Sequence, residues 1–269
     1  MLPLLPASRL ASAALLGAAL LGACAPAPAR TAGPAAAGTP GLQVAAEVEA
    51  DAAAFRAAFS DLGVAWVAAG RACVARAPEY RATCPKLPPV VDVAWDGLDV
   101  WAAVPSLAQV VTVDRAPRNV NVGRVVRLSA VAAYREDGSA VSYAGVARPG
   151  VLGAPSAALT GGDGVDYARV RGTLVRVPDG VLLRGAAGPY LVVTPGGAEA
   201  AEAPEVVTAA GRYRLAGGVL DWRDGAGVVR ARVPHGPGRV GRVGQEIVTV
   251  SAAGTVRRFT PDLSAELTR

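Results

Sequence analysis

Three carboxylates lie close together in the sequence beside two tryptophans, and these are the residues that could most simply do chemistry. Asp92, Asp96 and Asp99 lie in a short stretch of chain that also contains Trp95 and Trp101. Carboxylates beside aromatic rings can bind sugars or act as the acid and base of glycoside hydrolysis. Asp96, however, is also a turn residue, and aromatic residues beside turns commonly pack one sheet against another. We interpret the cluster as turn and core, with glycan chemistry as the alternative.

The chain contains a single histidine, His235, which lies in the turn-rich stretch 233–238. Any mechanism that needs an imidazole as base or metal ligand depends on this residue. The sequence has no Gly-x-Ser-x-Gly elbow and no His-Glu-x-x-His motif, so neither an activated serine nor a zinc site is indicated. We expect His235 to be a solvated loop residue, and we predict no catalytic residue, no metal ligand set and no cofactor.

A glycine-rich loop carries two further carboxylates, Asp163 and Asp166. Residues 161–166 match Gly-Gly-x-Gly-x-Asp, the opening of the calcium-binding nonapeptide repeat. Such repeats bind calcium when tandem copies stack and share ligands, whereas this chain has one copy. The simpler interpretation is a flexible loop that enters a strand at residues 167–170. Asp163 and Asp166 are therefore a tentative ligand loop.

Two cysteines, Cys73 and Cys84, bracket a short loop that contains a proline. The third cysteine, Cys24, belongs to the N-terminal segment described next. An even number of remaining cysteines in an oxidising compartment indicates a disulfide, whereas a metal site would need further ligands. We predict a Cys73–Cys84 bridge that contributes about 2–3 kcal/mol, chiefly by restricting the unfolded chain.

The N-terminal segment has the pattern of an export signal. Arg9 precedes an apolar run over residues 10–23, which at 14 residues is too short to cross about 30 Å of hydrocarbon as a helix. A charged start, a short apolar run and small residues at its end describe a signal peptide over residues 1–23. The end of this run, Leu21-Gly22-Ala23-Cys24, resembles the lipobox of bacterial lipoproteins.

This resemblance implies that the chain is cut before Cys24 and that the cysteine carries a diacylglycerol and a further acyl chain. Two lipid chains are sufficient for stable membrane anchoring. The alternative is an ordinary cleaved signal with an incidental cysteine. Ala25 follows the cysteine, where lipoproteins retained in the inner membrane usually have Asp. The resemblance therefore implies the periplasmic face of the outer membrane, or the cell surface.

Changes in composition divide the rest of the chain into three parts. Residues 24–41 join the lipidated cysteine to a Pro-, Ala- and Gly-rich stretch that cannot bury a core, which is typical of a tether. Over residues 42–62, apolar side chains recur every three or four positions, which predicts one amphipathic helix packing on the domain. Gly63 would follow its last turn. Residues 63–269 are expected to form a single β-rich domain.

Within that domain the apolar period is two, and Asp-Gly pairs mark tight turns between short strands. The glycines of four such turns, Gly97, Gly138, Gly180 and Gly225, are 41, 42 and 45 residues apart. A step near 42, with several strands in each unit, resembles the repeat of β-propellers.

The length of this region provides about five blades of roughly 40 residues, with six possible. The resemblance rests on period and turn chemistry, because no WD40 or kelch signature recurs. We predict an all-β fold, a small propeller preceded by the short helix, with a β-sandwich or irregular barrel as the alternative.

The formal charge of +5 comes almost wholly from arginines, since Lys86 is the one lysine. The arginines are spread singly, with Arg257-Arg258 the one adjacent pair. An exported protein does not meet genomic DNA, so we predict no nucleic-acid partner. The combined expectation is an exported, lipid-anchored envelope protein that acts as a non-enzymatic binding or scaffolding module. Its partners would be the membrane, through the anchor, and an envelope protein or glycan.

Two alternatives to this function remain open. The first is an envelope hydrolase or lyase that acts on glycans through acidic residues gathered at a propeller channel. The second is a structural surface lipoprotein without a specific ligand.

Overall fold

The computed structural model describes residues 55–183 and 188–268. The chain divides into two units, Met1–Pro40 and Gly41–Arg269, and every described residue belongs to the second unit. The predicted signal peptide, the lipidation site Cys24, the tether and the first part of the predicted helix, residues 42–54, therefore lie outside the described residues.

Seven antiparallel sheets, numbered here in chain order, contain the strands of the described residues. Sheet 1 comprises β1 (Arg56–Ser60), β2 (Gly63–Ala68), β3 (Arg71–Arg76) and β4 (Ala82–Thr83). Sheet 2 comprises β5 (Asp92–Asp96), β6 (Asp99–Val104), β7 (Gln109–Thr112) and β8 (Asn119–Asn121), with a short 3₁₀ helix, η1 (Pro105–Leu107), after β6. Sheet 3 comprises β9 (Val125–Leu128), β10 (Ala133–Arg135), β11 (Ala140–Val141) and β12 (Ala147–Arg148).

The second half of the unit contains the remaining four sheets, and two of them are smaller. Sheet 4 comprises β13 (Ala157–Thr160), β14 (Asp166–Val170), β15 (Thr173–Arg176) and β16 (Val181–Leu183). Sheet 5 has two strands, β17 (Tyr190–Thr194) and β18 (Gly197–Ala201). Sheet 6 comprises β19 (Glu205–Thr208), β20 (Gly211–Ala216), β21 (Val219–Arg223) and β22 (Val229–Pro234), and sheet 7 has β23 (Arg239–Val243), β24 (Glu246–Val250) and β25 (Val256–Phe259).

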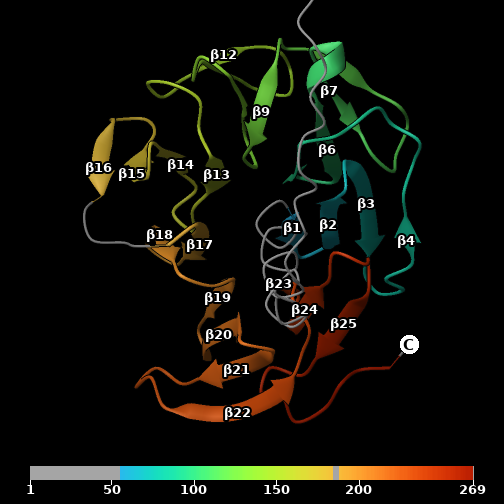
Figure 1. Ribbon diagram of the computed structural model, residues 1–269, viewed down its shortest axis with the longest axis vertical. Helices are drawn as coiled ribbons and strands as arrows, with labels where there is room; N and C mark the ends of the chain where they lie inside the picture. Colours follow the sequence, from blue (N-terminus) through green and yellow to red (C-terminus); the bar gives the residue numbers. More distant parts are fainter. Residues whose placement is uncertain (1–54, 184–187, 269) are drawn as a thin grey trace, which may run out of the picture. The chain divides into compact units, whose positions relative to one another are not determined.

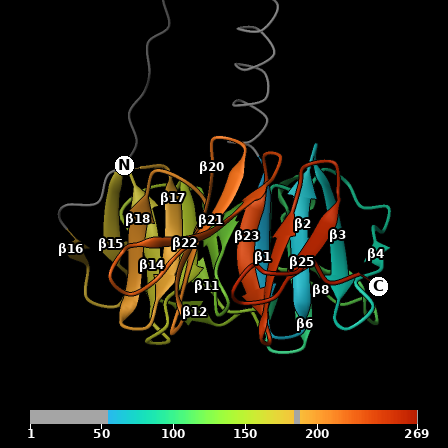
Figure 2. The ribbon, with the colours of Figure 1, turned by 90° about the horizontal axis from the view of Figure 1, so that it is seen from below.

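The first strand of each sheet contacts the first strand of the next sheet. β1 lies against β5, β5 against β9, β9 against β13 and β13 against β17. β17 then lies against β19, β19 against β23, and β23 against β1, which closes a ring of sheets (Figure 1). Figure 2 shows the strands running between the two faces of this ring. A closed ring of antiparallel sheets is a β-propeller, so the predicted all-β propeller fold is confirmed.

Apolar side chains fill most of the seams between neighbouring sheets. Trp95 packs with residues of sheets 1 and 2, and Trp66 with residues of sheets 1 and 7. Trp101 of sheet 2 stacks on Tyr143, which follows β11 of sheet 3, at a distance of 5.0 Å between the ring centroids. Further clusters join sheet 3 to sheet 4 and sheet 6 to sheet 7. These tryptophans beside turns pack sheet against sheet, as the sequence indicated.

The number of sheets differs from the expected five blades, with six possible, because the Asp-Gly turns occupy different places within their sheets. Gly97 lies between the first and second strands of sheet 2, and Gly138 between the second and third strands of sheet 3. Gly180 and Gly225 lie between the third and fourth strands of sheets 4 and 6. The sheets begin 36, 33, 32, 33, 15 and 34 residues apart. The 42-residue step therefore overestimates the repeat and underestimates the number of sheets.

The predicted helix over residues 42–62 is wrong in its described part, where residues 56–60 form strand β1. Ala57 and Phe59 pack in the seam with sheet 7, whereas Ala58 packs in the seam with sheet 2. A strand that is covered on both faces has no alternation of polarity, so its apolar spacing can imitate a helix. Gly63 begins β2 rather than ending a helix, and a Cβ there would lie 2.2 Å from the carbonyl oxygen of Ala75.

Candidate binding site

The acidic cluster of the sequence is divided between the two ends of one hairpin. Asp92 is the first residue of β5, whereas Asp96 and Asp99 face each other across the turn at its other end. Asp99 pairs with Arg118, whose guanidinium lies 5.1 Å from the ring centroid of Trp101. Burial and the nearby Asp99 raise the pKa of Asp96. The three carboxylates thus do not form one acid–base site.

Asp92 joins two sheets. Its Oδ1 accepts a hydrogen bond from its neighbour Val93 N–H at 3.0 Å, and its Oδ2 accepts one from Leu128 N–H of β9, also at 3.0 Å. Burial raises the pKa of Asp92, although Arg127 and Arg56 oppose this rise. The carboxylate therefore holds sheet 2 to sheet 3 at the end of the ring where β5 begins.

Asp166, one of the two residues of the tentative ligand loop, also joins sheets. Its Oδ2 accepts hydrogen bonds from the hydroxyls of Ser129, at 2.7 Å, and Tyr134, at 2.6 Å. Its Oδ1 accepts one from Thr160 at 2.6 Å. Ser129 and Tyr134 belong to the hairpin of β9 and β10, so Asp166 connects sheet 4 to sheet 3.

Asp163, the other residue of that loop, lies in the turn between β13 and β14. Its carboxylate accepts hydrogen bonds from Tyr167 Oη at 2.8 Å and from Val165 N–H at 3.1 Å. Within residues 55–183 and 188–268, no group of three or more His, Cys, Asp or Glu side chains is placed to hold a metal ion. Asp163 is thus bonded within its own sheet, whereas Asp166 of the same loop holds sheet 4 to sheet 3.

His235 is buried rather than solvated, contrary to the expectation from its turn-rich surroundings. Its Nε2 lies 2.6 Å from Thr249 Oγ1, and its Nδ1 lies 2.6 Å from the carbonyl oxygen of Gly236. The imidazole also packs against Phe259, with ring centroids 6.3 Å apart. Burial lowers the pKa of His235, which favours the neutral ring. The loop folds over β24, and this long-range contact could not be read from local turn residues.

The predicted disulfide between Cys73 and Cys84 is confirmed. Cys73 lies in β3, and Cys84 directly follows β4, the short outermost strand of sheet 1. The two Cα atoms are 4.2 Å apart. The bridge therefore fixes the outer edge of the first sheet.

A cluster of arginines lies at the end of the ring where the innermost strands begin. Arg239, the first residue of β23, donates a hydrogen bond to the carbonyl oxygen of Phe55 at 2.5 Å. Its guanidinium lies 4.9 Å from the ring centroid of Tyr190, the first residue of β17, which is a cation–π contact. Burial lowers the pKa of Arg239 to about 10. A buried guanidinium beside an aromatic ring is a strong site for an anionic group.

Two further arginines extend this cluster around the ring. Arg127 of β9 donates a hydrogen bond to the carbonyl oxygen of Ser156 at 2.6 Å. Burial lowers the pKa of Arg127, whereas Asp92 raises it and Arg56 lowers it further. Arg56, the first residue of β1, likewise lowers the pKa of Arg239. Arginines from three sheets are thus close enough to influence one another, with Asp92 beside them.

A pocket of about 140 Å³ opens next to Arg239. Tyr190 and Arg239 form its polar side, and Pro204 and Leu215 contribute apolar surface. The turn at residues 217–218 and the loop at 236–238 complete the lining with glycine and proline. Small residues leave room beside the guanidinium, so the pocket suits a carboxylate or another anionic group.

The sequence did not single out this cluster. Arg56, Arg127 and Arg239 lie far apart in the chain, and each looks like one of many singly spaced arginines. They meet because the first strands of the sheets stand side by side around the ring. Arg56 and Arg239 each open a strand, which is the sequence signal that could have found these two, whereas Arg127 is the third residue of β9.

Comparison with known proteins finds solved structures of low similarity to this chain. No known protein family matches the sequence, and no curated protein matches it. A streptogramin B lyase structure has 12% identity and a TM-score of 0.40, with 81% of this chain and 84% of that chain covered. BamB from Moraxella catarrhalis has 13% identity and a TM-score of 0.45, with 75% of this chain and 83% of that chain covered. The WD40 β-propeller domain of Doa1 has 13% identity and a TM-score of 0.43, with 80% and 81% covered.

The fold is taken from the strand contacts of this chain, and function is argued from its own residues. In the part of the chain that the structure describes, no helix is long and apolar enough to span a membrane.

Proposed function

We propose that this protein is a binding or scaffolding module of the bacterial envelope, exported by its N-terminal signal and anchored by lipid at Cys24. The observation that carries the binding function is the arginine cluster, in which Arg56 is close enough to lower the pKa of both Arg127 and Arg239. Arg239 also lines the pocket at one end of the ring. The ligand would be an anionic group of an envelope protein or glycan. A rigid ring of sheets suits this role, because its end presents residues from several sheets at once.

The anchor and the location rest on the sequence. The lipobox resemblance of Leu21-Gly22-Ala23-Cys24 supports lipidation, and Ala25 supports the outer membrane or cell surface. The residues between the cysteine and the domain would allow the ring to stand off the bilayer.

The alternative, glycan hydrolysis by acidic residues at the channel, receives less support from the geometry. Asp92, the carboxylate beside the arginines, is buried and accepts two backbone hydrogen bonds. A general acid or base must reach the substrate oxygen or its attacking water. The arginines, in contrast, are suited to holding a negative charge.

The binding function is tested with the full-length protein, produced in a bacterium that processes lipoproteins and extracted in detergent. The intact protein and a variant with Arg56→Gln and Arg127→Gln are used to capture partners from solubilised envelope. A control variant, Arg71→Gln with Arg115→Gln, removes the same charge from sheets 1 and 2 at exposed positions. We expect one stable partner to be retained by the wild type and the control and lost by the first variant, with thermal unfolding confirming that all three fold.

Capture that is equal in all three proteins would contradict a binding role for the arginine cluster, and turnover of envelope glycans by the purified protein would favour the hydrolase. The anchor has a separate test, in which Cys24→Ala moves the protein from the membrane fraction to the soluble periplasmic fraction. If the variant stays in the membrane fraction, the lipobox assignment is wrong.

A further inference from the structure

Sheet 5 has two strands, whereas its neighbours, sheets 4 and 6, have four each. The step from the start of β17 to the start of β19 is 15 residues, which leaves no length for a third and fourth strand. Sheet 6 nevertheless continues outward through β21 and β22 (Figure 1). The outer part of its face toward sheet 5 is therefore not covered by strands of the described chain.

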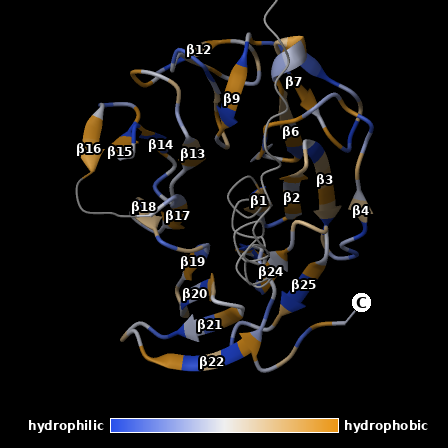
Figure 3. Ribbon diagram, viewed as in Figure 1, coloured by the Kyte–Doolittle hydropathy of each residue, from blue (hydrophilic) through white to orange (hydrophobic). Residues whose placement is uncertain are grey.

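That face of sheet 6 is charged. The strand register places Glu205 opposite Arg214, Arg214 opposite Asp221, and Asp221 opposite Arg232, in one row across all four strands. The opposite face carries Tyr213, Leu215 and Leu220, which pack on sheet 7. The alternation along β22 is visible in Figure 3, where hydrophilic and hydrophobic residues follow one another. The charges thus line the face that turns away from the apolar seam.

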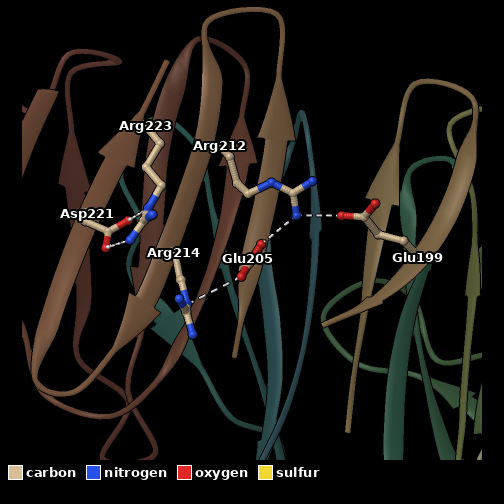
Figure 4. Close-up of polar contacts among 6 residues, drawn as sticks. All are labelled: Glu199, Glu205, Arg212, Arg214, Asp221 and Arg223. Atoms are coloured by element: carbon tan, nitrogen blue, oxygen red, sulfur yellow. Dashed lines mark hydrogen bonds and ion pairs between the residues drawn. The ribbon is translucent and has the colours of Figure 1, made fainter. Parts of the chain in front are cut away.

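Arginines outnumber carboxylates on this charged face. Arg212 and Arg223 stand opposite each other in the next row, beside the row that contains Arg214 and Arg232. Figure 4 shows Arg212 between Glu199 of β18 and Glu205, Arg214 beside Glu205, and Arg223 bound to Asp221. In these two rows, four arginines against Glu205 and Asp221 leave a net charge of 4 − 2 = +2, which Glu199 of β18 reduces to +1 across the seam.

The arginines of this face remain accessible. The side chains of Arg212, Arg214 and Arg223 are 38%, 36% and 35% exposed. Arg214 Nε is itself buried without a hydrogen-bond acceptor, at 3.5 Å from Glu205 Oε1. Arg212 and Arg214 share the carboxylate of Glu205. Their guanidinium groups could therefore also bind carboxylate oxygens of an incoming ligand.

The edge of β18 lies beside this face. A two-residue turn joins Thr194 to Gly197, so hydrogen-bonded pairs with β17 fall at Gly197, Glu199 and Ala201. The backbone N–H and C=O groups of Ala198 and Ala200 therefore point away from β17. Such an edge is a template for another strand, and alanine side chains allow it to come close.

We propose that the free edge of β18 and the charged face of β20–β22 together receive an extended acidic segment of a partner protein. The segment adds as a third strand of sheet 5, pairing with Ala198 and Ala200 through its backbone. Its carboxylate side chains on one face bind Arg214, Arg223 and Arg232 across the seam. This surface is separate from the arginine cluster at the end of the ring, so it does not depend on the function proposed above.

The test uses the full-length protein in detergent and a fluorescent peptide that alternates glutamate with valine and threonine. Binding is measured by fluorescence anisotropy. We expect Arg214→Gln with Arg223→Gln to weaken binding about tenfold or more, because each lost charged contact is worth that much at a well-formed site. The Arg71→Gln with Arg115→Gln variant is the control for net charge and should bind as the wild type does.

The strand pairing has its own variant and its own peptide. Ala200→Pro removes an outward N–H while leaving the ladder to β17 intact, and we expect it to abolish the same binding. A peptide that is N-methylated at alternate residues should also fail to bind. Hydrogen exchange of the variant confirms that sheet 5 remains folded.

Several results would overturn this proposal. The first two are the absence of saturable binding and equal binding of a peptide in which glutamine replaces glutamate. The other two are an equal loss of binding in the Arg71→Gln with Arg115→Gln control and unchanged binding of the N-methylated peptide. Preferential binding to phosphatidylglycerol vesicles through the same arginines would also overturn it, since the ligand would then be a lipid surface. The Arg56→Gln with Arg127→Gln variant should bind the peptide normally, so failure here is distinguishable from failure at the other site.

Discussion

At the scale of single residues, buried polar side chains hold the sheets of this protein to one another. Asp92 links sheet 2 to sheet 3 through one hydrogen bond, and Asp166 links sheet 4 to sheet 3 through two. His235 links the loop before β23 to Thr249 of β24. Buried polar groups of this kind are costly when unpaired, so each one favours a single arrangement of neighbouring sheets.

His235 predicts a specific dependence of stability on pH. Burial lowers its pKa in the folded state below the ordinary value of 6.5, so the unfolded state binds the proton more readily. The stability that the neutral ring contributes is present above pH 6.5 and is lost as the pH falls through the folded-state pKa. The measurement is the free energy of unfolding by urea between pH 7.5 and pH 5. This range covers the titration of a histidine in the unfolded state.

The matched variant for this prediction is His235→Gln, which keeps a polar side chain but does not titrate. We expect the wild type to lose up to about 1.4 kcal/mol per pH unit more than the variant within this window. His235 is the one histidine of the chain, so the difference between the two curves isolates it. Parallel curves would show that the ring is not held neutral by burial.

At the scale of strands and hairpins, the local chemistry of turns was a reliable guide, whereas apolar spacing was not. The Asp-Gly turns at Gly97 and Gly138 join β5 to β6 and β10 to β11, as their sequences indicated. β1, in contrast, was mistaken for part of a helix because it is covered on both faces. Turn type depends on two or three adjacent residues, but the covering of a strand depends on its neighbours in space.

The disulfide is the element-scale feature with the clearest energetic consequence. Cys73→Ser with Cys84→Ser should lower the free energy of unfolding by about 3 kcal/mol. The bridge joins cysteines 11 positions apart and so reduces the number of conformations open to the unfolded chain. Urea unfolding of the variant, and of the wild type with and without a reductant, measures this loss. The reduced wild type should match the variant, and a difference well below 1 kcal/mol would contradict the expected role of the bridge.

At the scale of the whole ring, closure depends on the seam between its first and last sheets. Gly241 of β23 lies against Phe59 of β1, and a Cβ at Gly241 would lie 2.1 Å from the phenyl ring. Arg239 adds a hydrogen bond across the same seam to Phe55. The two strands begin 183 residues apart in sequence, so this contact forms only when all intervening sheets are in place.

The closing seam predicts a destabilising effect of one added methyl group. Gly241→Ala should cost about 2 kcal/mol, because the extra atom forces the phenyl ring of Phe59 to move in a packed seam. Gly225→Ala is the control, since no atom lies within 4 Å of a Cβ there. Combining Gly241→Ala with Phe59→Leu should cost less than the sum of the two single changes, as measured in a double-mutant cycle. Simple additivity would mean that the two residues are not in contact.

The sequence by itself determined the local features of this protein: the tight turns, the β-rich class and the pairing of Cys73 with Cys84. The turns and the strand class depend on residues that are near one another in the chain. The disulfide depends on two cysteines that remain once Cys24 is assigned to the N-terminal segment. For the candidate site, the sequence named Asp163 and Asp166, which the structure shows bonded within and between their own sheets.

Only the tertiary structure decided that the described residues form seven sheets, that two described strands make up sheet 5, and that Arg56 lies close to both Arg127 and Arg239. The physical reason is that the neighbours of a strand across a seam come from distant parts of the chain. Their identity is fixed by how the sheets pack, which no local pattern of residues specifies.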